Sequence, residues 1–354
     1  MKDKQVDPII IWCQHSKTKP KRIYGVLMRS FRNILTGFLF LLYVLAGSIS
    51  WAVVYESLPD MPYPADNPAT PEKEKLGSVL FFDTQLSGNN KISCSTCHLR
   101  ELNWIDQKPQ AIGFKAKKLE RNSPTILNSG YSNSQFWDGR ATSLEEQALM
   151  PIQDPSEMNL PLPDLIDKLN SIPEYLSLFK SAFGDSKITP ERISKAIATF
   201  ERTLITQETN YDRYWKGDES AISVSAKRGM NLFFGKAKCS ICHTGPRFTD
   251  DQFHNIGVAT ADTDKEDIGR KKVTGEKFHL RAFKTPGLRY VSRTAPYMHD
   301  GSLNTLQEVV EFYDLGGNED SLKSPFISPI GLTPIEKKDL VEFIKALDKT
   351  ETPY

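Results

Sequence analysis

The sequence contains Cys94-Ser-Thr-Cys97-His98 and, further along, Cys239-Ser-Ile-Cys242-His243. Four of the five cysteines belong to these two motifs, and the fifth is Cys13. In such a motif the two thiols can add to the vinyl groups of a haem, and the adjacent histidine becomes the proximal ligand of the iron. The sequence therefore predicts two covalent haem c groups, one on Cys94, Cys97 and His98 and the other on Cys239, Cys242 and His243.

Two other kinds of site use paired cysteines, and the sequence disfavours both. A single zinc site is disfavoured because 141 residues separate Cys97 from Cys239. Redox disulfides of the thioredoxin kind are disfavoured because both motifs continue into histidine and no alternation of strands and helices surrounds them. Haem c is attached outside the cytoplasm, so the motifs also predict an exported protein.

Residues 34–55 form an uncharged stretch of 22 residues, long enough to cross a bilayer as a helix. Basic residues lie ahead of it, among them Lys17, Lys19, Lys21, Arg22, Arg29 and Arg32. The positive-inside rule then predicts a cytoplasmic tail at residues 1–33, an inner-membrane anchor at 34–55 and a periplasmic remainder. A cleaved signal peptide is the alternative, although the apolar run is long for one and no clean cleavage site closes it.

The composition is that of an ordinary globular protein, with 39% hydrophobic and 25% charged residues. The formal net charge is +1, so no overall field favours nucleic acid as a partner.

A short pattern occurs twice. Gly77-Ser-Val-Leu80-Phe81-Phe82 precedes the first motif, and Gly229-Met-Asn-Leu232-Phe233-Phe234 precedes the second. Each ends a predicted helix, at 71–82 and 224–234, and this internal repeat predicts two related domains. After a proline-rich linker at 56–70, we expect cytochrome c-like domains at 71–215 and 216–354, called the first and second halves below.

Each half is also expected to close with a helix. Helix start signals occur at Thr189-Pro190-Glu191-Arg192 and at Thr333-Pro334-Ile335-Glu336. Apolar residues with helical spacing follow: Ile193, Ile197, Phe200 and Leu204, and then Leu340, Phe343, Ile344 and Leu347. Strand signals are sparse. The expected fold class is all-α, with two haem domains, long loops and one N-terminal transmembrane helix.

The residue on the second axial position of each iron decides its chemistry, because a bound side chain favours electron transfer and an open position admits small ligands. For the second haem, the candidates are Met298, Tyr297 and His299 in the stretch 294–301. For the first haem, residues 99–121 contain neither histidine nor methionine. We therefore expect the first iron to be five-coordinate and reactive.

Several ordered motifs resemble those of the bacterial di-haem cytochrome c peroxidases and their relative MauG, over residues 70–350. They are Arg121-Asn-Ser-Pro-Thr125, Phe136-Trp-Asp-Gly-Arg140, Leu144-Glu-Glu-Gln-Ala148, Phe253-His-Asn-Ile-Gly257 and Ala295-Pro-Tyr-Met-His-Asp-Gly301. The resemblance implies that the His98 haem is the peroxidatic centre. It also implies that the His243 haem transfers electrons, with Met298 as its distal ligand.

The resemblance assigns further residues. Trp137 matches a tryptophan between the haems, and Gln147 and Glu157 match two residues over the peroxidatic iron. In that role a carboxylate moves a proton between the two oxygens of hydrogen peroxide. Asn122 matches the asparagine ligand of a calcium ion, which makes calcium a further expected cofactor.

Two positions depart from the patterns of known members. Many of these peroxidases block the resting peroxidatic iron with a histidine, and Phe114 stands at that position here. Phenylalanine cannot bind iron, so we expect a first centre that is open in the oxidised protein. MauG uses a tyrosine on its second haem and a tryptophan near the second motif, and here Met298 and Ala237 match those positions.

The leading functional hypothesis is a cytochrome c peroxidase that reduces hydrogen peroxide with electrons from a small periplasmic cytochrome c or cupredoxin. One alternative is a MauG-like oxidase that acts on a protein side chain. The other is a membrane-tethered electron carrier without enzymatic activity, which Gln147, Glu157 and the open first iron disfavour. A homodimer is considered because relatives are often dimeric.

Overall fold

The computed structural model describes residues 56–258 and 266–349. The expected tail at 1–33 and anchor at 34–55, together with Cys13, lie outside these ranges. Within the ranges, no helix is long and apolar enough to cross a membrane. All described residues belong to a single compact unit, so the division at residue 215 stays a prediction that rests on the repeat.

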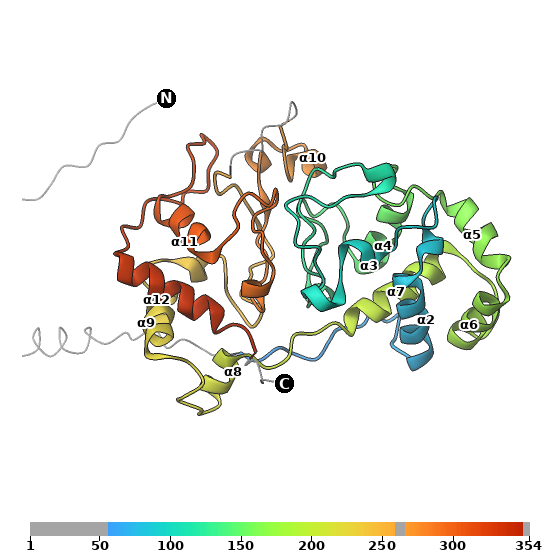
Figure 1. Ribbon diagram of the computed structural model, residues 1–354, viewed down its shortest axis with the longest axis horizontal. Helices are drawn as coiled ribbons and strands as arrows, with labels where there is room; N and C mark the ends of the chain where they lie inside the picture. Colours follow the sequence, from blue (N-terminus) through green and yellow to red (C-terminus); the bar gives the residue numbers. More distant parts are fainter. Residues whose placement is uncertain (1–55, 259–265, 350–354) are drawn as a thin grey trace, which may run out of the picture. The chain divides into compact units, whose positions relative to one another are not determined.

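The described residues of the first half contain seven α-helices, and Figure 1 labels each of them. They are α2 Pro71–Phe82, α3 Cys94–Cys97, α4 Leu144–Gln153, α5 Leu162–Asn170, α6 Pro173–Phe183, α7 Pro190–Arg202 and α8 Asn210–Trp215. Short 3-10 helices lie between them: η1 Thr84–Leu86, η2 Arg100–Leu102, η3 Phe114–Ala116 and η4 Ser129–Tyr131. The long loops expected from the sequence occupy the rest of this half.

The second half repeats the main helices of the first. Its α-helices are α9 Val224–Phe234, α10 Lys271–Thr274, α11 Leu306–Asp314 and α12 Pro334–Lys345. Its 3-10 helices are η5 Cys239–Ile241, η6 Lys277–His279 and η7 Val291–Arg293. The strands β1 Phe253–His254 and β2 Phe283–Lys284 pair antiparallel, so the fold is helix-dominated with one two-residue ladder.

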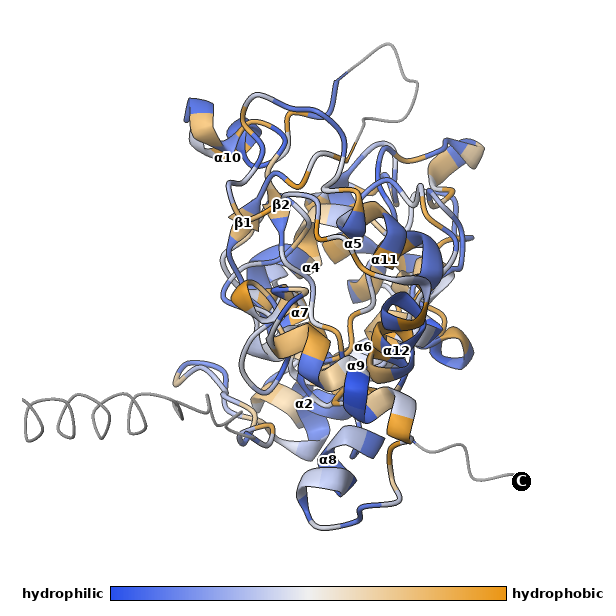
Figure 2. Cartoon of the chain, turned by 90° about the vertical axis from the view of Figure 1, so that its left-hand side faces the viewer, coloured by the Kyte–Doolittle hydropathy of each residue, from blue (hydrophilic) through white to orange (hydrophobic). Residues whose placement is uncertain are grey.

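The helix start signals predicted from the sequence form N-terminal caps in the structure. The side chains of Thr189 and Thr333 cap the N-termini of α7 and α12, and Thr333 forms a capping box with Glu336. The predicted apolar faces are buried except for Phe200 and Leu204, which are partly buried. Both helices end before the last apolar residue of the pattern, Leu204 or Leu347. The helices carry hydrophobic and hydrophilic residues together, as their amphipathic packing requires (Figure 2).

The repeated glycines explain how the two main helix pairs meet. In each half the helix before the haem motif packs on the closing helix, α2 on α7 and α9 on α12. A Cβ on Gly77 would lie 1.9 Å from the Ala196 oxygen, and one on Gly229 would lie 1.9 Å from the Asp339 oxygen. Both helix pairs therefore cross with backbone against backbone, at equivalent positions of the repeat.

Replacing Gly229 with alanine is expected to lower the free energy of unfolding by about 3 kcal/mol, because the new methyl group meets backbone that cannot move aside. Asn231→Ala, on the exposed side of the same helix, is the matched control and should stay within about 0.5 kcal/mol of the parent. Urea unfolding of the haem-loaded protein measures both. Equal stabilities of the two variants would contradict this account of the helix crossing.

The segment expected to be a linker, residues 56–70, packs against the first half. Asn67 is fully buried, and its amide donates to Glu145 Oε1 at 2.8 Å and to the Lys195 carbonyl at 3.0 Å. Closer to its start, the Pro59 carbonyl accepts from Tyr131 Oη at 2.8 Å. These contacts fix the path of the chain from Pro59 to α2.

Candidate functional site

One cavity of about 830 Å³ extends over both cysteine motifs. All eleven residues proposed from the sequence line it: Cys94, Cys97, His98, Asn122, Trp137, Gln147, Glu157, Cys239, Cys242, His243 and Met298. The first and last of them, Cys94 and Met298, are 204 positions apart in the sequence, and the fold brings all eleven to the wall of one cavity.

The two motif histidines are held in the same way. His98 Nδ1 lies 3.1 Å from the Trp104 carbonyl oxygen, and His243 Nδ1 lies 2.9 Å from the Phe248 carbonyl oxygen. A carbonyl can only accept, so each Nδ1 carries the proton and each Nε2 is left to bind a metal. Burial lowers the pKa of both imidazoles, which keeps them in the neutral, ligating form.

The motif cysteines suit thioether formation. None of Cys94, Cys97, Cys239 and Cys242 is in a disulfide. Burial is the main cause that raises the pKa of all four thiols, to about 12 at Cys97 and Cys239 and about 11 at Cys242. A zinc site would need thiolates with a nearby positive charge. The residues around the cavity therefore fit two covalent haems.

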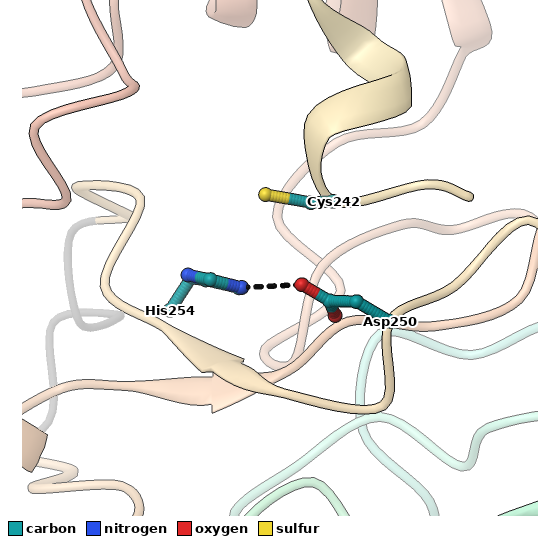
Figure 3. A group of neighbouring side chains, drawn as sticks. All are labelled: Cys242, Asp250 and His254. Atoms are coloured by element: carbon teal, nitrogen blue, oxygen red, sulfur yellow. Dashed lines mark hydrogen bonds and ion pairs between the residues drawn. The ribbon is translucent and has the colours of Figure 1, made fainter.

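Cys242, Asp250 and His254 form the one group with metal-ligand spacing within the described ranges, their ligand atoms lying within 4.8 Å of one another (Figure 3). His254 Nε2 is 2.8 Å from Asp250 Oδ2. The Cys242 sulfur belongs to the second haem motif, and a thioether sulfur is not available as a thiolate ligand. The His254–Asp250 pair is therefore a polar neighbour of the second haem.

Gln147 and Glu157 reach the first-motif part of the cavity from α4 and the turn that follows it. Ser143 caps this helix, and the turn is closed by the bond from Glu157 N to the Asp154 carbonyl at 3.0 Å. Phe114 N also donates to the Ser156 carbonyl at 2.9 Å, which fixes the loop next to Glu157. Burial, and then the nearby Asp154, raises the pKa of Glu157 to about 7.

Phe114, at the position of the blocking histidine, packs in the hydrophobic core of the first half and is not part of the cavity wall. Its neighbour Gly113 does reach the wall. A Cβ on Gly113 would lie 2.0 Å from the Ser156 oxygen, so the loop is pressed against the segment that carries Glu157. The loop therefore supports the segment that carries Glu157, while the Phe114 side chain lies away from the cavity.

Trp137 and Asn122 lie where the two halves meet. The Trp137 indole donates to the Asn122 carbonyl at 2.9 Å, and the Trp137 carbonyl accepts from Lys284 N of the second half at 2.8 Å. Asn122 N in turn donates to the His299 carbonyl at 2.7 Å. The Asn122 side-chain amide donates to the Lys108 carbonyl at 2.8 Å, which leaves its oxygen as the group suited to a cation.

The loop that carries Met298 has the same backbone features as the loop that carries Phe136. Each contains an isolated bridge, Tyr297 with Leu303 and Gln135 with Ala141, and each has a left-handed residue directly after the first bridge partner. The φ angle is 74° at Met298 and 68° at Phe136. Beyond each loop a capped helix begins, α11 in the second half and α4 in the first.

Because α4 and α11 are equivalent, the residues they present to the cavity can be compared. Helix α4 presents Gln147 and Pro151, and the matching positions of α11 are Val309 and Tyr313. Tyr313 is close to the second motif: burial, and then Cys239 and Cys242, raises its pKa. The second haem therefore has two candidate distal ligands, Met298 and Tyr313.

Comparisons with known proteins show the family to which the chain belongs. Residues 71–220 match the family model described as di-haem cytochrome c peroxidase. The methylamine utilization protein MauG of Methylorubrum extorquens is 44% identical over 293 residues, which cover 81% of each chain. The chain belongs to the di-haem cytochrome c peroxidase and MauG family.

Two other members of the family illustrate its range. The cytochrome-c peroxidase IdrP1 of Pseudomonas sp. (strain SCT) is 38% identical over 330 residues, covering 83% of this chain and 85% of the relative. A crystal structure of a MauG-like protein associated with microbial copper homeostasis has a TM-score of 0.76 and 33% identity, covering 85% of this chain and 96% of that chain. Membership makes the protein an oxidoreductase with two haem c groups.

The sequence analysis missed Tyr313. The family motif drew attention to residues 295–301, and Tyr313 lies beyond it in the helix that follows. The signal was present, because Ser143-Leu144 and Thr305-Leu306 start equivalent helices. Continuing the alignment of the two halves along these helices would have placed Tyr313 opposite Pro151.

Proposed function

We propose that this protein is a di-haem peroxidase that reduces hydrogen peroxide at the first haem, with electrons delivered through the second. The observation that carries the proposal is Glu157, a buried carboxyl with a pKa of about 7 on the wall of the first haem cavity. An electron carrier has no use for a proton-transferring group at this place. When bound, the haem iron supplies a coordination site for peroxide and one-electron redox chemistry.

The side chains around the first haem perform the proton transfers. As a carboxylate, Glu157 would accept the proton of one peroxide oxygen and return it to the other oxygen, which would leave as water. The Gln147 amide can donate a hydrogen bond to the bound peroxide and orient it. The whole reaction is H2O2 + 2 H⁺ + 2 e⁻ → 2 H2O, so two electrons and two further protons must enter the site.

Trp137 supports the electron route that this reaction needs. Its hydrogen bonds join Asn122 of the first half to Lys284 of the second, and its side chain lines the cavity that both haem motifs share. An indole placed there shortens the path between two redox centres. We infer that each electron from the second haem passes by Trp137.

A second function is favoured by Tyr313. A tyrosine beside the second haem, instead of methionine alone, agrees with a MauG-like oxidase in which a protein side chain supplies the two electrons. Ala237, at the position of the tryptophan that MauG uses near its second motif, argues against this function.

Peroxide consumption by the purified haem-loaded protein separates the two functions. We expect steady turnover with a reduced small cytochrome c or a reduced cupredoxin, and a high-spin signal from the first haem in the fully oxidised protein. If neither donor supports turnover, the MauG-like oxidation of a protein side chain becomes the favoured function. An oxidised protein with only six-coordinate low-spin haem would contradict the open first centre.

We further propose a periplasmic location, with residues 34–55 as an inner-membrane anchor. Asn122 is the proposed side-chain ligand of a calcium ion between the haems. A homodimer is the assembly suggested by the family resemblance.

A further inference from the structure

The internal repeat allows the walls of the two haem cavities to be compared residue by residue. Gly77 on Ala196 and Gly229 on Asp339 are equivalent contacts, and the next neighbours, Phe200 and Phe343, are equivalent too. These equivalent contacts align α7 with α12, so that each residue of one helix corresponds to one residue of the other. This register is fixed by backbone contacts and does not depend on which residues face the haems.

In this register each closing helix presents two residues to its haem cavity, four positions apart on one helical face. They are Ile197 and Glu201 on α7, and Leu340 and Ile344 on α12. Glu201 is 5% exposed and Ile344 is 7% exposed. The first haem therefore meets a buried carboxyl at the place where the second haem meets an isoleucine.

The Glu201 carboxyl is not neutralised by its neighbours. The adjacent Arg202 directs both terminal nitrogens to Glu145 on α4, at 2.7 and 3.0 Å. From α2, Lys73 Nζ bonds to Asn67 Oδ1 at 3.2 Å and also to the Pro68 carbonyl. Within the described part of the chain, Glu201 has neither a hydrogen-bonding side chain nor an ion-pair partner.

A carboxyl in this position responds to the charge of the haem. Burial, with a smaller contribution from Glu145, raises the pKa of Glu201 to about 8 even though Arg202 lowers it. Cys94, which anchors the first haem, is close enough for the charge of Glu201 to raise its thiol pKa. At a buried site of low dielectric constant, a change of one charge on the haem strongly shifts the protonation equilibrium of a nearby carboxyl.

We propose that Glu201 couples proton uptake to reduction of the first haem. The positive charge of the oxidised centre would lower the pKa of Glu201 below its value without haem and so favour the carboxylate. When an electron arrives, that charge falls by one and Glu201 takes a proton from solvent: Glu201-COO⁻ + H⁺ → Glu201-COOH. When the electron leaves, the proton is released. Glu201 thus brings into the cavity one of the protons that peroxide reduction consumes, a role that rests on the proposed function, whereas the redox coupling itself does not.

Spectroelectrochemical titration of the haem-loaded protein tests the coupling at equilibrium, without peroxide. Because Glu157 lines the same cavity and also titrates near neutral pH, the reference protein is Glu157→Gln. In it, the reduction potential of the first haem should fall as pH rises towards about 8. The second haem, whose cavity is lined by Ile344 at the equivalent position, is the internal control. Its reduction potential should depend on pH much less.

Adding Glu201→Gln should abolish this pH dependence of the first haem, and Glu201→Ile, which copies the wall of the second cavity, should do the same. An unchanged pH dependence in both variants would overturn the proposal. Two variants are used because one of them can fail to fold. If the coupling is lost as expected while the parent protein shows no peroxide turnover, the proposed function fails and this inference stands.

Discussion

Replacing Glu157 with glutamine is expected to lower kcat/KM for hydrogen peroxide by about 10²–10⁴-fold, the usual contribution of a positioned acid–base group. Glutamine keeps the size and the hydrogen bonds of the side chain but cannot accept the peroxide proton. Steady-state oxidation of a reduced small cytochrome c measures the effect. Glu174→Gln, an exposed residue of α6 away from the cavity, is the matched control and should retain parental activity.

The pH profile of the same reaction carries a second signature of Glu157. Only the carboxylate can accept the peroxide proton, and burial raises its pKa to about 7. The rate should therefore rise with pH through about 7 and fall as the group becomes protonated below it. Glu157→Gln should lose this dependence along with the activity. A variant that keeps both the parental rate and its pH profile would remove Glu157 from the mechanism.

The sequence was sufficient for features that depend on local patterns. The helices α2 and α9 were predicted with the bounds that the structure has, and the caps at Thr189 and Thr333 form as expected. These features follow from residues close together in the chain, whose propensities and spacing act without tertiary contacts.

Features that depend on the cavity could not be predicted in the same way. Glu201 looked like an ordinary charged residue near the end of an amphipathic helix, and only the backbone contact at Gly77 shows that it faces the first haem motif. Tyr313 was missed for a similar reason. In both cases the decisive information is which helix face meets the cavity, and the crossing of two helices decides this.

The distal ligand of the second haem can be identified by a pair of variants. Tyr313 occupies the cavity side of α11, the helix equivalent to α4, which carries Gln147 on the cavity wall. Met298 lies on the preceding loop, which matches the loop of Phe136. The equivalence of the two helices and the proximity of Tyr313 to Cys239 and Cys242 make Tyr313 the residue that would bind the iron of the second haem.

Tyr313→Phe is therefore expected to remove the low-spin six-coordinate signal of the oxidised second haem and to raise its reduction potential, because a phenolate stabilises ferric iron. Met298→Leu is the matched control and should leave that signal unchanged. Electron paramagnetic resonance of the oxidised protein measures both. The opposite pattern, with the signal lost only in Met298→Leu, would identify Met298 as the ligand. It would favour a high-potential electron-transfer haem, as in a peroxidase that draws electrons from a small donor protein.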